Sequence, residues 1–331
     1  MDKGGGLMGT KKFINICKLV QTDLKAYLNK ELSKYYKNVI SKNGFIYVKG
    51  KDKICLTAHM DTVHKEPVKD VVIGKEDGKH IVSSPQGIGG DDRCGIYMIL
   101  KILEAGLRPT IIFCEDEEIG CVGSNKFAES KFIKSLEKMF FLIELDRRGY
   151  QNIVFYDDAN DEFHDFVSDI TGFEEETGSY SDICELSPAC GISSVNIGCG
   201  YYKAHTTNEY VIMEEMETTI KAVIKLMKQG LKNKVRYEYI ENNVSPFLSS
   251  KYKDYYDDWY DMPSTTKYIT GYISYDNGYG DKGEEEIDGF SVEEVFYNFF
   301  VKHQDISFSM ITDYYLHDEN YNSVTPLLNA I

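Results

Sequence analysis

The chain has 331 residues, a hydrophobic fraction of 42% and a net charge of −16. The acidic excess argues against a nucleic acid partner, because phosphate binding requires a basic surface. No apolar run reaches the length of a membrane span, and the N-terminus lacks the apolar stretch of a secretory signal. We therefore expect a cytoplasmic protein that contacts no membrane.

The eight cysteines favour the same compartment. They are scattered along the chain, form no C-x-x-C pair, and in several cases lie inside apolar runs such as Ile54-Cys55-Leu56. This pattern is typical of buried free thiols in a reducing cytosol rather than of a disulfide framework.

Apolar spacing and turn residues predict the elements of the first third of the chain. In chain order they are a helical region over about 11–40, as one long helix or two short ones; strands 45–48 and 53–58, joined by a turn into a hairpin; a second hairpin of 71–73 and 80–83; and a helix over about 93–105. Gly106 is well placed to end that last helix.

The next part of the chain alternates strands and helices. The predicted elements are strand 110–114, a helical stretch over about 130–139, strands 140–145 and 152–155, helix 161–171, strand 194–197 and helix 213–231. The first of these strands is almost entirely apolar, as in strands covered on both faces. The alternation predicts an α/β fold with a mostly parallel central sheet and helices on both faces. Ligands in such sheets bind beyond the carboxyl ends of the strands.

The composition changes after about Arg236. We expect a catalytic domain over residues 1–240 and an accessory region over 241–331, which is acidic and rich in tyrosine. Its glycines and acid runs predict an irregular or partly disordered stretch over about 241–289, and a capping box at Ser291 predicts a helix over about 292–302. We expect no catalytic or metal-binding group in this region. Its tyrosines and Trp259 suit a contact surface, which includes the possibility of a homo-oligomer.

His59 and Asp61 directly follow the apolar strand that ends at Ala58. Residues at this spacing on an extended chain point to the same side. One of them can bind a metal while the other accepts the imidazole N–H and fixes its tautomer. His-x-Asp pairs also arise by chance, so this pair needs further ligands to be informative.

Adjacent carboxylates supply such ligands in two further segments. Asp91 and Asp92 follow a glycine-rich turn at the start of a predicted helix, where one acid can cap the helix and the other can bind metal. Four consecutive acids, residues 115–118, follow the strand at 110–114. An acidic surface loop is the ordinary interpretation of such a run, but at the end of a buried strand the mutual repulsion calls for a cation.

Asp146 and His205 complete the set, one at the end of strand 140–145 and the other just before helix 213–231. The other five histidines lie in no such segment, and we expect them to be surface or packing residues. Two histidines with three carboxylates suit two divalent ions that share one carboxylate. Zinc is the first expectation, with manganese or cobalt as alternatives for a site of oxygen and nitrogen donors.

The order H-x-D, G-x-D-D, E-E, D and H resembles the di-zinc exopeptidases, which include peptidase T, the carboxypeptidase G group and the lidless bacterial leucyl and glutamyl aminopeptidases. The resemblance covers roughly residues 11–231. It implies a zinc-exopeptidase-like fold in which Asp61 holds His59, Asp91 bridges the metals and Glu117 is the general base. The two implied ligand sets are His59, Asp91 and Asp146 for one zinc, and Asp91, Glu118 and His205 for the other.

The spacing of the segments favours an aminopeptidase acting on free N-termini. Only 58 residues separate Asp146 from His205, too few for the dimerisation domain that the carboxypeptidase-like branch inserts there. Between them, Asp182 can meet a substrate α-ammonium or can cap a short helix. Tyr180 is a candidate substrate-binding residue, and with Tyr201 and Tyr202 it is either an oxyanion donor or a packing residue.

Two other functions remain open. One is a zinc amidohydrolase of the same fold that acts on N-acyl amino acids, which the ligands alone do not distinguish from a peptidase. The other is a catalytically silent binding module, which predicts losses among the ligands or the base. None of these residues is lost here.

Overall fold

The computed structural model describes residues 5–76, 78–178 and 180–241, together with 269–276, 282–289 and 311–318. The chain divides into two compact units, Met1–Asn243 and Val244–Ile331, and each is described here by itself. No helix in the described ranges combines the length and apolarity needed to cross a bilayer.

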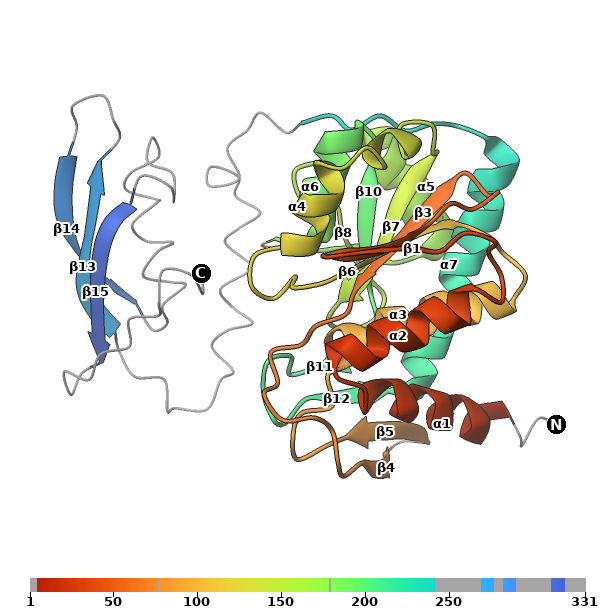
Figure 1. The fold of residues 1–331 in the computed structure, drawn as a ribbon, viewed down its shortest axis with the longest axis horizontal. Helices are drawn as coiled ribbons and strands as arrows, with labels where there is room; N and C mark the ends of the chain where they lie inside the picture. The colour runs from red at the N-terminus through yellow and green to blue at the C-terminus, as the bar shows by residue number, and fades with distance from the viewer. Residues whose placement is uncertain are drawn as a thin grey trace. The chain divides into compact units, whose positions relative to one another are not determined.

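The first unit is built on an eight-stranded sheet (Figure 1). Its strands, in spatial order, are β1 (Ile40–Lys42), β2 (Phe45–Val48), β6 (Thr110–Cys114), β3 (Ile54–His59), β7 (Phe141–Arg147), β10 (Ser194–Gly198), β8 (Asn152–Val154) and β9 (Glu174–Glu175). The four central strands, β6, β3, β7 and β10, are mutually parallel. The predicted mostly parallel α/β sheet is therefore confirmed.

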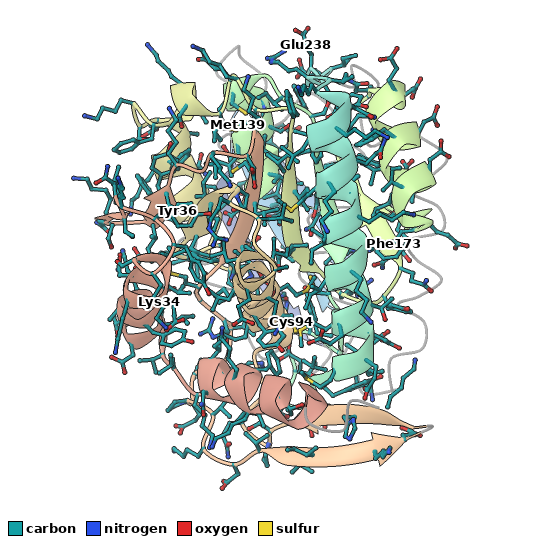
Figure 2. All side chains as sticks on the ribbon, turned by 90° about the vertical axis from the view of Figure 1, so that its right-hand side faces the viewer. Lys34, Tyr36, Cys94, Met139, Phe173 and Glu238 are labelled. Atoms are coloured by element: carbon teal, nitrogen blue, oxygen red, sulfur yellow. The ribbon has the colours of Figure 1, made fainter. Side chains whose placement is uncertain are left out.

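Helices cover both faces of this sheet. They are α1 (Gly5–Cys17), α2 (Gln21–Leu32), α3 (Gly90–Glu104), α4 (Val122–Ala128), α5 (Asp161–Thr171), α6 (Asp182–Cys190) and α7 (Met213–Asn233). Alternate residues of β3 belong to different cores: Leu56 packs in the cluster under α1, α3 and α7, whereas Cys55 packs in the cluster under α4 and α6. In Figure 2, α7 runs lengthwise over the first of these faces. Burial on both sides explains why the central strands are mainly apolar, with few buried polar residues such as Thr57, Glu144 and Asn196.

A second, four-stranded sheet lies beside the first one in the same unit. Its order is β11 (Tyr201–Tyr202), β12 (Tyr210–Ile212), β5 (Lys79–Ser83) and β4 (Val72–Glu76). The β4–β5 hairpin was predicted, and its pairing is confirmed. Through the pairing of β5 with β12 it joins the segment that carries His205, far away in the sequence.

Two local predictions in this unit are wrong. Strands β2 and β3 do not pair with each other, because β6 lies between them. A Cβ at Gly50 in the connection would lie 2.2 Å from backbone atoms of Pro109, so the chain turns against the start of β6 instead of closing a hairpin. The helix expected over 130–139 is only the 3₁₀ turn Ile133–Ser135, while α4 precedes it. Leu136 and Met139 are nevertheless buried, so turns satisfy the apolar pattern that resembled a helix.

The prediction of an irregular stretch over 241–289 is also wrong in part. Residues Ile269–Asp276 (β13) and Lys282–Gly289 (β14) are antiparallel strands, and β13 also pairs with β15 (Ile311–Asp318). The glycines and acids of these segments suggested loops, but Thr, Tyr and Ile favour a pleated strand once a partner is present. The helix predicted over 292–302 lies outside the described residues.

All eight cysteines are free in the structure, and all except Cys184 are buried. Burial raises the pKa of several of these thiols, with Cys55 and Cys94 well above the usual value. We expect thiol titration of denatured, unreduced protein to find eight thiols, and the native protein to react slowly because little thiolate is present or accessible. A reduced sample serves as the control. A count of about half or fewer without reductant contradicts the prediction.

Candidate metal centre

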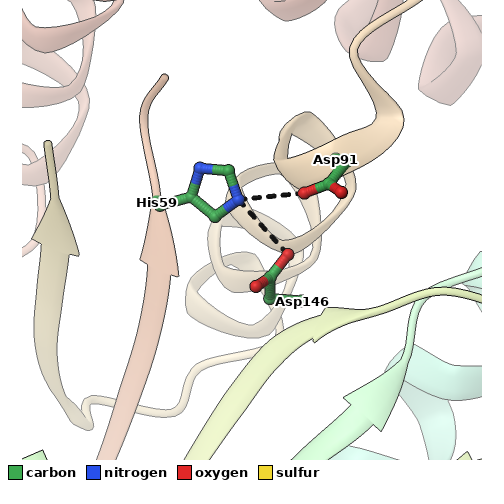
Figure 3. A group of neighbouring side chains, drawn as sticks. All are labelled: His59, Asp91 and Asp146. Carbon is green, nitrogen blue, oxygen red and sulfur yellow. Dashed lines mark hydrogen bonds and ion pairs between the residues drawn. The ribbon is translucent and has the colours of Figure 1, made fainter. Parts of the chain in front are cut away.

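The predicted ligands converge at one edge of the central sheet. His59 is the last residue of β3, Asp146 lies near the end of β7, and the acid run 115–118 follows β6. Because these strands are parallel neighbours, their carboxyl ends meet at the same edge. Asp91 reaches this edge from the start of α3, and Figure 3 shows it facing His59 together with Asp146.

One group of potential ligands consists of His59, Asp91 and Asp146. The Nε2 atom of His59 lies 2.9 Å from Asp91 Oδ1 and 3.3 Å from Asp146 Oδ1. His59 is 1% exposed, and its other ring nitrogen lies 3.2 Å from Asp61 Oδ1. The contact with Asp61 leaves Nε2 facing the two carboxylates, the arrangement that a metal-binding imidazole requires.

The second group consists of Asp91, Glu118 and His205. The Nε2 atom of His205 lies 3.2 Å from Asp91 Oδ2 and 3.1 Å from Glu118 Oε2. Asp91 thus presents one carboxylate oxygen to each histidine. The structure brings all five predicted ligands together in two groups that share Asp91.

Asp61 contacts other parts of the site besides His59. The backbone N–H groups of Glu117 and Glu118 donate to its two carboxylate oxygens, each at 3.0 Å. The Glu117 carboxylate lies 4.0 Å from His59 Nε2. These hydrogen bonds connect the end of β3 to the acid run and aim both glutamates at the centre.

The first half of the acid run has partners in the protein. Glu115 accepts hydrogen bonds from Lys25 Nζ at 2.6 Å and from the Gly44 N–H at 2.7 Å. Gln21 Nε2 donates to Asp116 Oδ1 at 2.9 Å. The repulsion within the run is therefore relieved by α2 on one side, and only Glu117 and Glu118 face the metal groups.

The two acids at the start of α3 divide the tasks predicted for them. Asp92 accepts hydrogen bonds from the Gly95 N–H at 2.8 Å and the His59 N–H at 3.2 Å. Because Asp91 and Asp92 are not helical, Asp92 caps the regular part of α3 that begins after them. Asp91 makes the contacts with both histidines. The peptide bond between the two aspartates is cis.

The charges of the cluster fit a site for divalent cations. Burial and the neighbouring carboxylate of Asp91 raise the pKa of Asp146 to about 7 against the effect of His59. Burial also raises the pKa of Glu117 to about 9. Hydrogen bonds with Asp91 and Glu118 raise the pKa of His205 to about 11. Glu118 Oε1 is buried without a hydrogen-bond partner among the described residues. The carboxylates need more positive charge than the protein provides, and oxygen and nitrogen donors of this kind suit divalent metals.

Comparison with known proteins agrees with this geometry. Residues 38–172, less than half of the chain, match the model of Peptidase family M28. No curated protein matches the sequence.

The fold matches solved peptidase structures. The aminopeptidase PepT from Bacillus cereus superposes with a TM-score of 0.54 at 15% identity, covering 68% of this chain and 98% of that one. A tripeptidase from Staphylococcus aureus gives 0.54 at 14% identity, with coverages of 69% and 99%. The resemblance to the di-zinc exopeptidases is confirmed. An aminopeptidase from the archaeon Desulfurococcus kamchatkensis gives 0.52 at 13% identity, covering 66% of this chain and 95% of that one. At these identities the structural matches establish the exopeptidase fold.

The two candidate substrate-binding residues, Asp182 and Tyr180, differ in their exposure to solvent. Asp182 is fully buried at the start of α6, and neither of its carboxylate oxygens has a hydrogen-bond partner among the described residues. Tyr180 is 53% exposed, and its hydroxyl donates to Glu185. An α-ammonium contact by Asp182 stays a prediction, which its burial does not support. The alternative of a cap at Asp182 has no support either, because the N-cap position of α6 is Ser181.

The other two candidate tyrosines bond to the protein. Tyr201 is buried and donates to the backbone carbonyl of Asp146 at 2.9 Å, and Tyr202 donates to Glu215 at 2.5 Å. Both hydroxyls therefore bond to groups of the protein, and a role as oxyanion donor stays a prediction.

Sequence reasoning missed several side chains that support the exopeptidase-like site. Arg93 is buried and donates to the backbone carbonyls of Met60 at 2.6 Å and Asp61 at 3.1 Å. Glu209 is fully buried and bonds to His64, a histidine that was expected to have no part in the site. The only sequence signal was position, because Arg93 directly follows Asp91-Asp92 and Glu209 lies four residues after His205.

Proposed function

We propose that this chain is a metal-dependent exopeptidase that hydrolyses the N-terminal peptide bond of unblocked peptides. The observation that carries the proposal is the pair of ligand groups sharing Asp91, with a further glutamate, Glu117, beside them and outside both groups. A hydrolase of this kind needs both metal ligands and a separate base.

The donor set assigns His59, Asp91 and Asp146 to one ion and Asp91, Glu118 and His205 to the other. Zinc is the proposed metal, because it accepts a mixture of imidazole and carboxylate ligands, and Mn²⁺ or Co²⁺ would fit the same donors. When bound, the two ions would polarise the scissile carbonyl and lower the pKa of a shared water to about 7.

Glu117 is the proposed general base. Its carboxylate accepts the proton of the attacking water and then returns it to the leaving amine. A carboxyl with a pKa of about 9 would keep its proton at neutral pH, so this role requires nearby positive charge. Asp61 acts on the reaction indirectly, since it orients His59 and anchors the backbone of Glu117.

Peptides are the proposed substrates because the solved structures that this fold matches are peptidases. An open groove also lies beside the loop of His205, although none of the proposed ligands lines it. It has a volume of about 600 Å³ and includes Lys203, Thr207 and Asn208, which flank His205 in sequence. A groove of this size offers room for substrate residues beyond the scissile bond. A zinc amidohydrolase acting on N-acyl amino acids is the alternative for the same ligands.

Action at the N-terminus is favoured by the chain between Asp146 and His205. That stretch forms the strands β8, β9, β10 and β11, which belong to the two sheets of the unit, and the helices α5 and α6 between them. Its described residues therefore hold no inserted domain of the kind implied for the carboxypeptidase-like branch of the resembled family.

We expect an N-terminally blocked peptide to resist hydrolysis, while amidation of the C-terminus leaves the rate nearly unchanged. An α-ammonium suits a centre rich in carboxylates, and acylation removes that charge. The measurement is release of the first residue from a matched set of free, N-acetylated and C-amidated peptides, with N-acetyl amino acids included.

The set separates the three activities. Hydrolysis that stops on C-terminal amidation identifies a carboxypeptidase. Hydrolysis of the N-acetyl amino acids alone identifies the amidohydrolase. No hydrolysis of any compound by protein that holds two metal ions identifies a silent module.

A further inference from the structure

Glu209 lies at the centre of a hydrogen-bond cluster beneath the metal centre. The side chain is fully buried. Its Oε2 atom accepts from the Gly89 N–H at 2.7 Å, and its Oε1 atom accepts from the Asp91 N–H at 3.0 Å. His64 Nε2 lies 2.9 Å from the same Oε2 atom. A buried carboxylate is tolerated only when such donors satisfy it, so this arrangement is specific.

These contacts join two of the three segments that supply the second metal group, those of Asp91 and His205. Asp91 is held directly through its backbone N–H. His205 lies in the same loop as Glu209, and a hydrogen bond from the Glu209 N–H to the Thr206 carbonyl at 3.1 Å ties the two together. Glu209 therefore sets the position of the Asp91 carboxylate relative to the His205 side chain.

His205 depends on its loop for its orientation. Its φ of 62° lies in the left-handed region, and its side chain is 57% exposed. Residues in that region keep their conformation only where the surrounding structure imposes it. In contrast, His59 is buried and is held by Asp61.

The packing around Glu209 leaves little freedom. A Cβ at Gly87 would lie 2.2 Å from Cε1 of the His64 ring. A Cβ at Gly90 would lie 2.8 Å from the Tyr201 Cβ and 3.3 Å from Glu209 Oε1. The glycine-rich turn before Asp91 thus fits closely around both members of the pair.

We propose that Glu209, supported by His64, is a positioning residue that holds Asp91 and the His205 loop in register and thereby forms the second metal site. The proposal rests on the two-metal function described above. The Glu209 side chain bonds to the backbone N–H of Asp91 rather than to its carboxylate, and it belongs to neither ligand group.

The test is binding of Zn²⁺ alone to metal-free protein, measured by competition with a chelator. Glu209→Gln keeps the shape but presents an amide to the backbone N–H groups in place of one oxygen. We expect binding of the second ion to weaken by roughly 10–100-fold, as for other residues that orient ligands, while binding of the first ion changes less. Glu217→Gln is the matched control. Glu217 lies on α7, accepts a hydrogen bond from the Tyr97 hydroxyl and belongs to neither metal group.

His64 provides a second, independent variant. We expect His64→Ala to weaken binding of the second ion as Glu209→Gln does. His64→Gln retains a hydrogen-bond donor, so we expect it to recover part of the lost affinity. These variants leave Glu209 in place, so they decide the question even if Glu209→Gln does not fold.

The outcomes are distinguishable. Wild-type protein that binds fewer than two ions overturns the proposed function and this inference with it. The role of Glu209 alone is overturned if wild type binds two ions tightly and Glu209→Gln binds both equally tightly. If Glu209→Gln does not fold, the same result in His64→Ala overturns it.

Discussion

Replacing Glu117 with Gln is expected to lower kcat by roughly 10²–10⁴-fold, the usual contribution of a general base, while both metal ions stay bound. Glutamine cannot accept the proton of the attacking water. The Glu117 side chain belongs to neither ligand group, and its backbone N–H still donates to Asp61 in the variant. Hydrolysis of an unblocked peptide and metal analysis of the same sample measure the two effects.

Glu115→Gln is the matched control for this experiment. Glu115 belongs to the same acid run but bonds to Lys25 and to the Gly44 N–H, away from the ligands. We expect this control to lose some stability and to keep its activity. Residual activity of Glu117→Gln within about tenfold of wild type, a barrier change of only about 1.4 kcal/mol, contradicts the assignment of the base.

Replacing Asp91 with Asn is expected to remove both metal ions and all activity. Asp91 offers one oxygen to each ligand group, and an amide cannot supply two anionic oxygens. His205→Ala removes a ligand from the second group only, so we expect about one ion per chain to remain on His59, Asp91 and Asp146. Metal content after dialysis against trace metal, measured per folded chain, separates the two variants.

The comparison of these variants tests the shared ligand directly. Two ions per chain in Asp91→Asn would show that Asp91 is not shared. Two ions per chain in His205→Ala would remove His205 from the ligand set. Circular dichroism of both variants confirms that any loss of metal is not a loss of fold.

Local sequence patterns predicted the central sheet and the edge at which the ligands gather. The mainly apolar runs that end just before His59, at Cys114 and just before Asp146 are buried strands, since a strand covered on both faces has few polar positions. A polar residue that follows such a run must lie at the carboxyl end of the sheet. This is why His59, the acid run 115–118 and Asp146 could be predicted as candidate ligands without a structure.

Pairing between distant segments was not predictable in the same way. The turn between Val48 and Ile54 suggested a hairpin, but β6, more than fifty residues later, inserts between the two strands. In the C-terminal region, β13 becomes a strand by pairing with β14 and β15. The free energy of strand pairing depends on the partner, and the sequence of one segment does not name its partner.

By itself, the sequence determined which side chains are candidate metal ligands and which donor atoms they offer. The side chains of His59, Asp91, Glu118, Asp146 and His205 carry the donor atoms wherever the fold places them. Tertiary structure alone decided how tasks divide among neighbours: Asp92 caps while Asp91 contacts both histidines, and Glu115 pairs with Lys25 while Glu117 faces the centre. It also decided the role of Glu209, whose carboxylate reaches Gly89 and Asp91 across about 120 residues of chain. Such roles depend on hydrogen bonds between segments that only folding brings together, and no local pattern encodes them.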